Sequence, residues 1–561
     1  MVCYTAQTCF ITFQNATYCC SLIYSYALRR NHLLKLKEAS IKWALKSIEK
    51  SFDTYIFPMP FEYEAIKLFE QDVIDYLKNI DVLSEGMRDY RSSLTPKSIM
   101  GFRIATQLDP LDSIISQAII YEISDDIERA RLPKGNEVVY SFRLKPESDG
   151  KLYDPDYNWS KFFEKADKIL KEDPYSHILV TDISDFFPSI YLHYIETVLK
   201  EAVASSGKVA HAQVLINYIK AMHLNQTHKG VPVGPQFSRP IAELILDVVD
   251  KILLAKGIKF IRYVDDYIIF SKSEIDARIN LAFIAQELYD KRHLKLNEKK
   301  TKILTEKEFK ETHLTKPDEI AESAILVKFQ ELLEELDIDQ DPYEEIAPED
   351  LSEEDWEKLR SINLEQILEE ELSKQEPSSF LISFLLANLA RIDNTSVADT
   401  ILQKENIVKL FPKLRTIINY LERVRSFSVG QKQNLGEKIL DLIASSFVGT
   451  LEFNRMWLLN LFTKTSEWDN ENQFVNLYTN YSDDLTRREI FLALGRSKNI
   501  EFYRSNKSIN LDINSWIRRA FIAGISCLPK DEREPWFKSR GLRNRDFMDK
   551  IVEKWALKNH F

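Results

Sequence analysis

Three aspartates carry the clearest chemical signal in the sequence. Asp265 and Asp266 are adjacent inside the apolar run "FIRYVDDYIIF" (260–270), and Asp182 directly follows the apolar stretch "HILVT". Burying unpaired carboxylates is costly, so such side chains in apolar surroundings indicate bound cations. Mg²⁺ prefers oxygen ligands, and the backbone carbonyl of Ile183 can complete the ligand set. Two such ions, with Mn²⁺ as the alternative metal, would activate an attacking hydroxyl and stabilise a leaving pyrophosphate.

The segments around these aspartates alternate between strand and helix patterns. Residues 31–130 are expected to be mainly helices, interrupted by an aromatic, Pro-rich insert at 51–65. Further along, strands are expected in 137–144, at the start of 176–187, in 258–263 and in 267–272, and helices in 190–202, 242–255 and 278–293. Helices mixed with a short antiparallel sheet predict an α+β fold to about residue 320.

The character of the sequence changes after about residue 330. Residues 331–357 contain fourteen acidic side chains and no Lys or Arg, which predicts a solvated linker over 331–358, with an interaction or autoinhibitory segment as the alternative. Without these fourteen charges the formal net charge of −11 becomes about +3, so the acidity does not exclude a nucleic-acid partner. Apolar residues at helical spacing over 359–561 predict an all-α, helical-repeat-like domain, with an irregular bundle as the alternative.

The N-terminus and the cysteines bear on where the protein acts. Residues 1–30 are expected to be a disordered N-terminal extension, because residues 1–28 carry no charge and polar residues interrupt each apolar run, unlike a signal peptide. No stretch is apolar and long enough to span a membrane, so we expect no membrane partner. Five cysteines in 561 residues are too few for a disulfide framework, which indicates the reducing cytoplasm.

Four sequence blocks in a fixed order resemble the palm of reverse transcriptases. They are "TDISDFFPSI" (181–190), "GVPVGPQFSRPIAEL" (230–244), "FIRYVDDYIIF" (260–270) and "LKLNEKKTKIL" (294–304), which resemble motif A, motif B, the YxDD box and motif D. Residues 103–120 and 138–144 resemble the fingers of the same family. The resemblance implies a right-hand polymerase with fingers and palm over 31–320, acting as an RNA-directed DNA polymerase.

The resemblance assigns the catalytic residues. Asp182, Asp265 and Asp266 match the metal-binding carboxylates of the family. Phe187, five residues after Asp182, falls at the position of the steric gate. A ring at that position would occupy the space of a ribose 2′-hydroxyl and select deoxynucleotides, whereas we expect the neighbouring Phe186 in the core.

Further residues are assigned to the substrate in the same way. Arg143 matches the fingers arginine that meets the incoming triphosphate, where a guanidinium suits phosphate oxygens; the alternative is a charge at the surface of a strand. Lys300 matches the motif D lysine that could protonate the leaving pyrophosphate, with the neighbouring Lys299 and Lys302 as alternatives. Gly234, Pro235 and Gln236 match the motif B loop that approaches nucleotide and template closely.

Within the family, the chain is most similar to the bacterial abortive-infection reverse transcriptases, the group that includes AbiA and AbiK. The similarity rests on Val233 in "GVPVGP", where many relatives carry Gln, on the insert at 51–65 and on the long helical C-terminus. It implies a role in antiviral defence, in which a homo-oligomer makes DNA from dNTPs. In this group a protein tyrosine primes the synthesis, and some members need no template. The alternatives are templated copying of a dedicated non-coding RNA and a phage-sensing scaffold that needs no catalysis.

Overall fold

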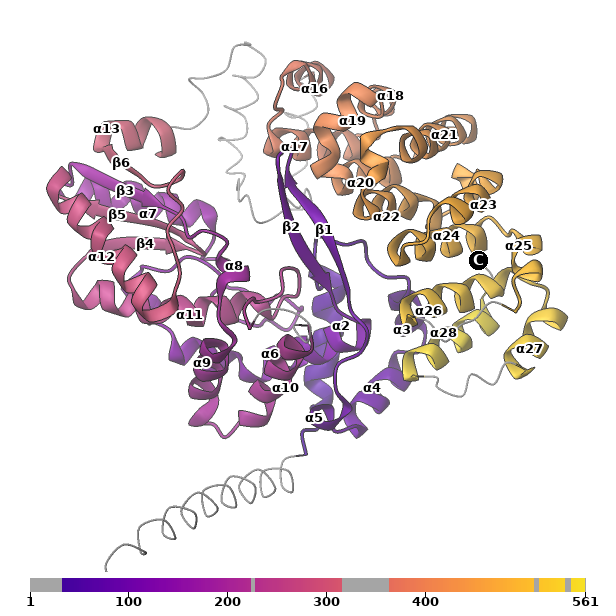
Figure 1. Cartoon of the computed structure of the whole chain (residues 1–561), viewed down its shortest axis with the longest axis horizontal. Coiled ribbons are helices and arrows are strands. Elements are labelled where there is room, and N and C mark those ends of the chain that lie inside the picture. Colours follow the sequence, from indigo (N-terminus) through magenta and orange to yellow (C-terminus); the bar gives the residue numbers. More distant parts are fainter. Residues whose placement is uncertain (1–32, 223–227, 315–362, 509–513, 540–545, 560) are drawn as a thin grey trace, which may run out of the picture.

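The chain folds into two halves that meet along a central β-hairpin (Figure 1). The computed structural model describes residues 33–222, 228–314, 363–508, 514–539 and 546–559 together with Phe561. We call residues 33–314 the N-terminal half and residues 363–561 the helical half. The predicted N-terminal extension and acidic linker lie outside the described residues. Among the helices in the described ranges, none combines the length and apolar character that crossing a bilayer requires.

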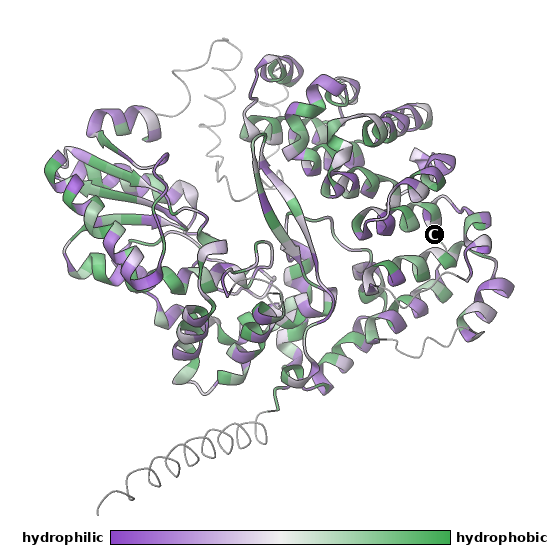
Figure 2. Ribbon diagram, viewed as in Figure 1, coloured by the Kyte–Doolittle hydropathy of each residue, from purple (hydrophilic) through white to green (hydrophobic). Residues whose placement is uncertain are grey.

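A four-stranded antiparallel sheet forms one end of the N-terminal half. Its strands are β3 (His177–Thr181), β4 (Lys259–Tyr263), β5 (Asp266–Ser271) and β6 (Lys302–Thr305), in the order β4-β5-β3-β6. The strands are predominantly apolar (Figure 2), and helices α11 (Ser238–Ala255) and α12 (Glu274–Arg292) pack against them. The structure therefore contains the short antiparallel sheet that the strand patterns predict.

Helix α6 (Pro110–Ala130) is the centre of the second part of the N-terminal half. It is buried along most of its length, with Asp109 capping its first turn and Pro110 at its first position. Helices α2 (Glu38–Ser51), α9 (Leu192–Ala204) and α10 (Val209–Met222) pack around it. The remaining α-helices of this half are α3 (Glu62–Leu68), α4 (Glu70–Asn79), α5 (Val82–Glu85), α7 (Trp159–Glu172), α8 (Phe186–Ser189) and α13 (Glu306–Phe309).

The hairpin between the two halves is absent from the prediction, which expects mainly helices before residue 130. Strands β1 (Arg91–Ser98) and β2 (Gly101–Gln107) pair antiparallel, and Leu94 lies opposite Ile104. The sequence "RSSLTPKS" of β1 is polar and contains a proline, so it lacks the β-branched and aromatic residues that mark strands. Tertiary contacts hold it extended instead, because β1 packs on the helical half.

The prediction of a strand over 137–144 is wrong, because the structure has only isolated bridges in this segment. Only Val139 makes a bridge to the sheet, to Arg262 on β4, with flanking hydrogen bonds from Arg262 N to Val138 O at 2.7 Å and from Tyr140 N to Arg262 O at 2.9 Å. Phe142 then has a φ of 45°, in the left-handed region, which turns the backbone away from the sheet edge. The apolar residues of 138–144 are buried, but the turn at Phe142 ends the pairing with β4.

The described part of the helical half contains helices and no strand. Helices α17, α20, α22, α24, α26 and α28 pack in succession, each against the next, and form a curved row (Figure 1). The main helices are α16 (Leu364–Ser373), α17 (Ser379–Arg391), α19 (Lys404–Leu410), α20 (Leu414–Arg423), α21 (Val429–Ser445), α22 (Glu452–Asn460), α23 (Glu471–Asn480), α24 (Asp484–Arg496), α25 (Ile500–Ser505), α26 (Ser515–Gly524), α27 (Lys530–Ser539) and α28 (Phe547–Lys558).

The aromatic insert at 51–65 joins the two halves. The ring of Phe57 packs against Phe453 of α22 with centroids 5.7 Å apart. The indole N–H of Trp457, one turn further along α22, donates to the carbonyl of Ile56 at 3.0 Å. Since the insert is rich in aromatic rings, it supplies a large apolar contact area in few residues.

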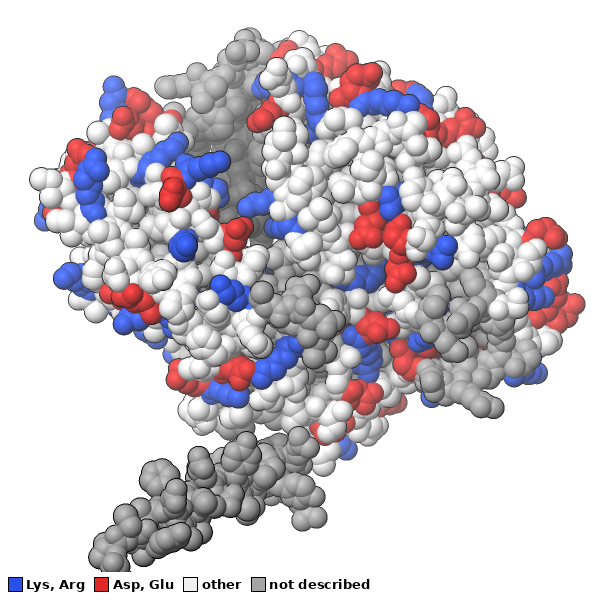
Figure 3. All heavy atoms as spheres, viewed as in Figure 1, with Lys and Arg blue, Asp and Glu red and all other residues white. Residues whose placement is uncertain are grey.

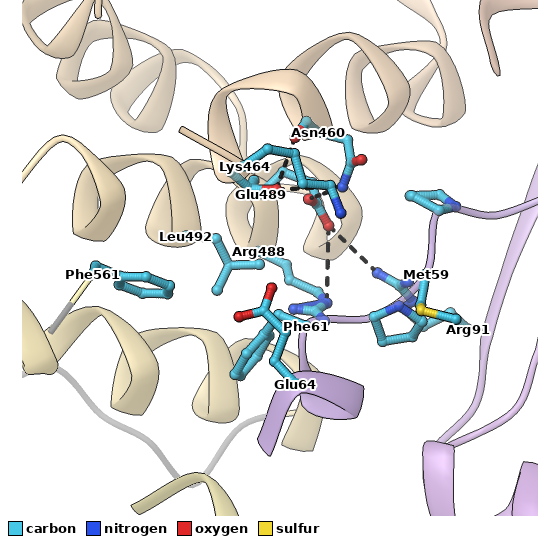
Figure 4. A pocket seen from close by; sticks show the side chains of 13 residues that line it. Met59, Phe61, Glu64, Arg91, Asn460, Lys464, Arg488, Glu489, Leu492 and Phe561 are labelled. Carbon is cyan, nitrogen blue, oxygen red and sulfur yellow. Dashed lines mark hydrogen bonds and ion pairs between the residues drawn. The ribbon is translucent and has the colours of Figure 1, made fainter. Parts of the chain in front are cut away.

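A buried group of charges lies close to Phe57, whose ring is 6.0 Å from the Arg91 guanidinium; Figure 4 shows Arg91, Arg488 and Glu489 of this group. Arg488 of α24 pairs with Glu62 of α3 at 2.6 Å, and both side chains are at most 1% exposed. Glu489 lies between Arg488 and Arg91, 3.9 Å from each guanidinium, and the Arg91 guanidinium stacks over Trp516 at 4.2 Å. Charges buried this deeply make the contact between the halves dependent on every partner being present.

Candidate active site

The structure brings the three predicted aspartates together. Asp182 follows the last residue of β3, and Asp265 and Asp266 lie at the turn from β4 into β5. Strands β3 and β5 are paired neighbours with Thr181 opposite Tyr267, so this register places Asp182 beside the turn. One carboxylate oxygen from each aspartate lies within 4.8 Å of the others.

The electrostatics of this cluster favour a divalent cation. Burial, together with the nearby carboxylates of Asp266 and Asp182, raises the pKa of Asp265 to about 8. Lys300 approaches Asp182 Oδ2 at 3.2 Å, and although burial lowers its pKa, the three carboxylates raise it overall. One ammonium does not balance three carboxylates, and a donor set made only of oxygens suits Mg²⁺ or Mn²⁺.

The backbone pairing of Ile183 shows which side of the strand its carbonyl faces. Ile183 forms a bridge with Leu296, while the flanking hydrogen bonds run from Asn297 N to Asp182 O and from Ser184 N to Lys295 O. In such a non-hydrogen-bonded pair, the carbonyl of each residue points away from the partner strand, so the Ile183 carbonyl points away from Leu296. The Ile183 carbonyl therefore points toward the β5 side of β3, and its metal ligation stays a prediction.

The turn that carries Asp265 is held in a strained conformation. Val264 has a φ of 54°, a left-handed value that is unfavourable for a β-branched residue. Its N–H donates to the Ser141 hydroxyl at 2.8 Å, and its carbonyl accepts from Arg262 Nη1 at 2.7 Å. Two buried partners thus fix the backbone one residue before Asp265.

A buried polar network holds those two partners. Arg262 donates hydrogen bonds to the Asp250 carboxylate of α11 from Nε at 3.0 Å and from Nη2 at 2.6 Å. The Ser141 hydroxyl donates to Glu243 of α11 at 2.7 Å, and Arg131 pairs with the other oxygen of Glu243 at 2.7 Å. Buried polar networks that are satisfied in this way fix one geometry. Helix α11 therefore determines the shape of the aspartate turn.

The motif B loop is locked by close backbone contacts. Gly234 has a φ of 130°, and a Cβ at this position would lie 2.2 Å from the Thr106 carbonyl oxygen of β2, so only glycine fits. The N–H of Thr106 donates to the Val233 carbonyl at 2.7 Å. Pro235, next in the loop, is buried.

Gln236 links this loop to the aromatic insert. Its backbone N–H lies 3.4 Å from Asp53 Oδ1, and its side-chain amide donates to the Phe52 carbonyl at 3.3 Å. The Tyr153 hydroxyl donates to Gln236 Oε1 at 3.2 Å. These contacts position the loop, and the predicted contacts of Gly234, Pro235 and Gln236 with substrate stay predictions.

The two phenylalanines after Asp182 differ in burial, and a gate residue needs a side chain that a nucleotide can reach. Phe186 is buried at 3% exposure, and Phe187 is half-buried beside it, with ring centroids 5.5 Å apart. The Phe187 carbonyl accepts from Val231 N at 2.9 Å, which ties the gate position to the motif B loop. Its role in sugar selection stays a prediction.

Residues 101–320 match the family model described as reverse transcriptase (RNA-dependent DNA polymerase). This segment carries the three aspartates, the motif B loop and Lys300. Residues 101–320 are a reverse transcriptase domain. The chain is therefore a nucleic-acid polymerase enzyme.

Solved telomerases from two yeasts are similar to the chain at low identity. A C-terminally truncated apo telomerase from Candida tropicalis is 12% identical, with a TM-score of 0.28, over 38% of this chain and about half (49%) of that chain. Telomerase from Candida albicans in complex with a TWJ fragment of telomeric RNA is 10% identical, with a TM-score of 0.29, over 88% of this chain and 70% of that chain. No curated protein sequence matches the chain.

The predicted triphosphate ligand lies inside the reverse transcriptase domain and not on its surface. Arg143 is 1% exposed, pairs with Glu128 at 3.2 Å, and donates to the Leu132 carbonyl at 2.8 Å. Its guanidinium also lies 5.7 Å from the Tyr157 ring. These partners favour a structural role, and contact with a triphosphate would require their rearrangement, so that assignment stays a prediction.

Sequence reasoning overlooked the residues that position the aspartates. Asn297 donates to Asp182 Oδ2 at 3.1 Å, and the hydroxyls of Thr301 and of Thr181, the residue before Asp182, lie 2.7 Å apart. Asn297 lies within the motif D block, which is the signal that could have identified it. Ser141 had no such signal, because its contact with Val264 spans 123 positions in the chain.

Proposed function

We propose that the protein is a reverse-transcriptase-type DNA polymerase that transfers nucleotides from dNTPs to a growing DNA strand. The observation that carries the proposal is the cluster of Asp182, Asp265 and Asp266, with oxygens within 4.8 Å of one another, in a reverse transcriptase domain. When bound there, two Mg²⁺ or Mn²⁺ ions supply the charge that activates the attacking 3′-hydroxyl and stabilises the pyrophosphate.

Individual residues take the following parts in this proposal. The three aspartates hold the ions, with the Ile183 carbonyl as a further oxygen. Lys300, whose raised pKa keeps it protonated, donates a proton to the leaving pyrophosphate. Phe187 excludes a ribose 2′-hydroxyl, which makes dNTPs the substrate.

The charge distribution supports a nucleic-acid partner. Lys and Arg side chains gather on both sides of the hollow between the four-stranded sheet and the β1–β2 hairpin (Figure 3). Phosphate groups are attracted to such a surface and release counterions from it. An RNA template and a DNA product are both compatible with it.

We further propose a role in cytoplasmic antiviral defence of the abortive-infection type. The support is the resemblance of the motif B form with Val233, the aromatic insert and the helical half to that bacterial group. On this proposal, a homo-oligomer makes DNA that is primed by one of its own tyrosines, and synthesis without a template is an option. Templated copying of a dedicated non-coding RNA is the second candidate, which the reverse transcriptase match supports equally.

The proposal is tested by incubating purified protein with Mg²⁺ and each labelled dNTP separately, without added template or primer. Label that stays with the protein until protease treatment supports protein priming, and loss of labelling after RNase pretreatment supports a bound RNA template. Absence of incorporation, even with an added primed RNA template, contradicts the polymerase proposal. A phage-sensing scaffold remains as the alternative, and it predicts that Asp265→Asn with Asp266→Asn still protects cells.

A further inference from the structure

A partly exposed group of aromatic rings lies where the start of α9 meets the end of α12. The start of α9 and the end of α12 supply its rings, and the residues just before the motif B loop supply a lysine, Lys229. We call it the α9–α12 aromatic patch. Its rings are those of Tyr191, His193, Tyr194, Tyr289 and His293, with neighbouring centroids 3.9–6.3 Å apart.

Cations lie over the faces of these rings. Lys229 Nζ is 4.3 Å from the centre of Tyr191, and the Arg292 guanidinium is 4.9 Å from the centre of Tyr194. Lys291 and Lys295 are exposed beside the patch, and in the described part of the chain neither they nor Lys229 pair with a carboxylate. The patch thus combines rings with several positive charges.

Three of the five patch rings are exposed, and the rings of Tyr191 and Tyr194 are half-buried. Tyr289 is 53% exposed, and His193 and His293 are also exposed. Exposed aromatic groups with adjacent cations are the composition with which proteins bind single-stranded nucleic acids, because bases stack on the rings and phosphates meet the cations. Lysine is depleted in protein–protein interfaces, whereas Lys229, Lys291 and Lys295 lie in or beside this patch, which favours a nucleic acid over a protein partner.

Backbone hydrogen bonds join the patch to the catalytic segments. Leu192 N donates to His228 O at 3.1 Å and Gly230 N to Ile190 O at 2.7 Å, so the start of α9 is paired with the entry to motif B. On the other side, the loop that begins at His293 runs on to Asn297, which contacts Asp182. The patch is therefore tied on one side to the motif B loop and on the other to the segment that contacts Asp182.

We propose that the α9–α12 aromatic patch binds the bases and phosphates of a single-stranded nucleic acid that enters or leaves the polymerase site. The inference rests on the proposed polymerase function, because it supplies the strand. The site is separate from the aspartate cluster, and it adds affinity only for strands that extend beyond that cluster.

Two variants of the full chain test the inference through different interactions. Tyr289→Ala with His293→Asn removes two rings, and Asn tolerates the φ of 55° at position 293. Lys291→Gln with Lys295→Gln removes two charges. The matched control is Phe447→Ala with Lys307→Gln, which alters an exposed ring and an exposed cation elsewhere.

Binding of a fluorescent 20-nucleotide oligothymidine is measured by anisotropy in EDTA, without dNTPs. The ring variant is expected to bind at least tenfold more weakly, and the charge variant to lower the slope of log affinity against log salt by about 1.4. A bromodeoxyuridine-substituted strand should form photo-crosslinks to the patch rings. Affinity and slope equal to the control, with crosslinks elsewhere, overturn the inference. Because this experiment requires no nucleotide incorporation, a failure of the binding inference can be distinguished from a failure of the proposed polymerase activity.

Discussion

Asn297 holds Asp182 at two points: its side-chain amide donates to Asp182 Oδ2 at 3.1 Å, and its backbone N–H donates to the Asp182 carbonyl at 2.7 Å. The carboxylate therefore has a fixed direction before any ion binds. Pre-orientation of this kind lowers the cost of assembling a metal site, because the ligand need not be ordered on binding.

We expect Asn297→Ala to lower kcat by about 10–100-fold, the usual cost of removing a partner of a metal ligand. The reason is that Asp182 loses its side-chain donor while the backbone hydrogen bond survives. Primer extension at several Mg²⁺ concentrations measures the effect, and high Mg²⁺ should restore part of the rate. Glu298→Ala, on the exposed neighbouring residue, is the control; an equal loss there would contradict the role of Asn297.

We expect Ser141→Ala to lower both stability and activity. The change leaves the Val264 N–H and one Glu243 oxygen without their buried partner, at a cost of about 1–3 kcal/mol in the free energy of unfolding. Adding Val264→Gly should recover part of the loss, since glycine adopts the left-handed φ of 54° without strain. Denaturant unfolding and primer extension measure the two effects. Ser148→Ala, at an exposed serine, should change neither.

The stability of the protein and its affinity for Mg²⁺ should change with pH in opposite directions. Because the folded-state pKa of Asp265 is raised to about 8, its contribution to stability without metal is present at low pH and is lost as the pH rises through 8. Mg²⁺ binds the deprotonated carboxylate, so its affinity should rise between pH 6 and 8.5.

Thermal unfolding across this pH range measures both effects: stability in the absence of Mg²⁺, and the additional stability that Mg²⁺ provides. The stabilisation by Mg²⁺ should grow with pH in the natural protein and be nearly absent in Asp265→Asn. A stabilisation that is independent of pH would contradict the raised pKa.

Gly234→Ala should disable the motif B loop. The added Cβ would meet the Thr106 carbonyl oxygen at 2.2 Å, and the φ of 130° is strained for any side chain, so we expect a loss of about 2–4 kcal/mol in stability or a displaced loop. Unfolding experiments and the KM for dNTP report on the two outcomes. Gly207→Ala serves as the control, because its φ is also positive but its Cβ would meet no atom within 4 Å.

Glu62→Ala should strongly weaken the contact between the two halves. It leaves Arg488 buried without its partner, which costs about 3–5 kcal/mol. Glu49→Ala breaks the exposed pair with Lys67 and should cost less than about 1 kcal/mol. Limited proteolysis together with thermal unfolding distinguishes the two variants. Equal unfolding temperatures would show that the buried pair does not hold the halves together.

Local patterns predicted the catalytic strands and the aspartate cluster, but not the network that supports them. Asp182, Asp265 and Asp266 follow apolar strands whose period is visible in any short window, and their motifs occur in a fixed order. Glu243 and Asp250 face the turn from α11, and nothing in the helix sequence shows which residue they meet. Arg143 was expected at a surface or a substrate, whereas a contact with Glu128 fifteen positions earlier holds it inside.

The hairpin between the halves was overlooked for a similar reason. Its strand Arg91–Ser98 has a polar sequence, and it is extended because the hairpin partner and the helical half surround it. Long-range packing of this kind outweighs local propensity and leaves no pattern along the chain.

The insert at 51–65 has a practical consequence for work with shorter fragments. At one end, Asp53 and Phe52 meet Gln236 of the motif B loop, and further along, Phe57 packs against Phe453. A fragment that stops near residue 320 would lose the surface that buries Phe57 and leave Glu62 without Arg488. Such a fragment would be prone to aggregate, and its motif B loop would be unsupported. Dissection of this enzyme is therefore better done with point substitutions in the intact chain than by truncation.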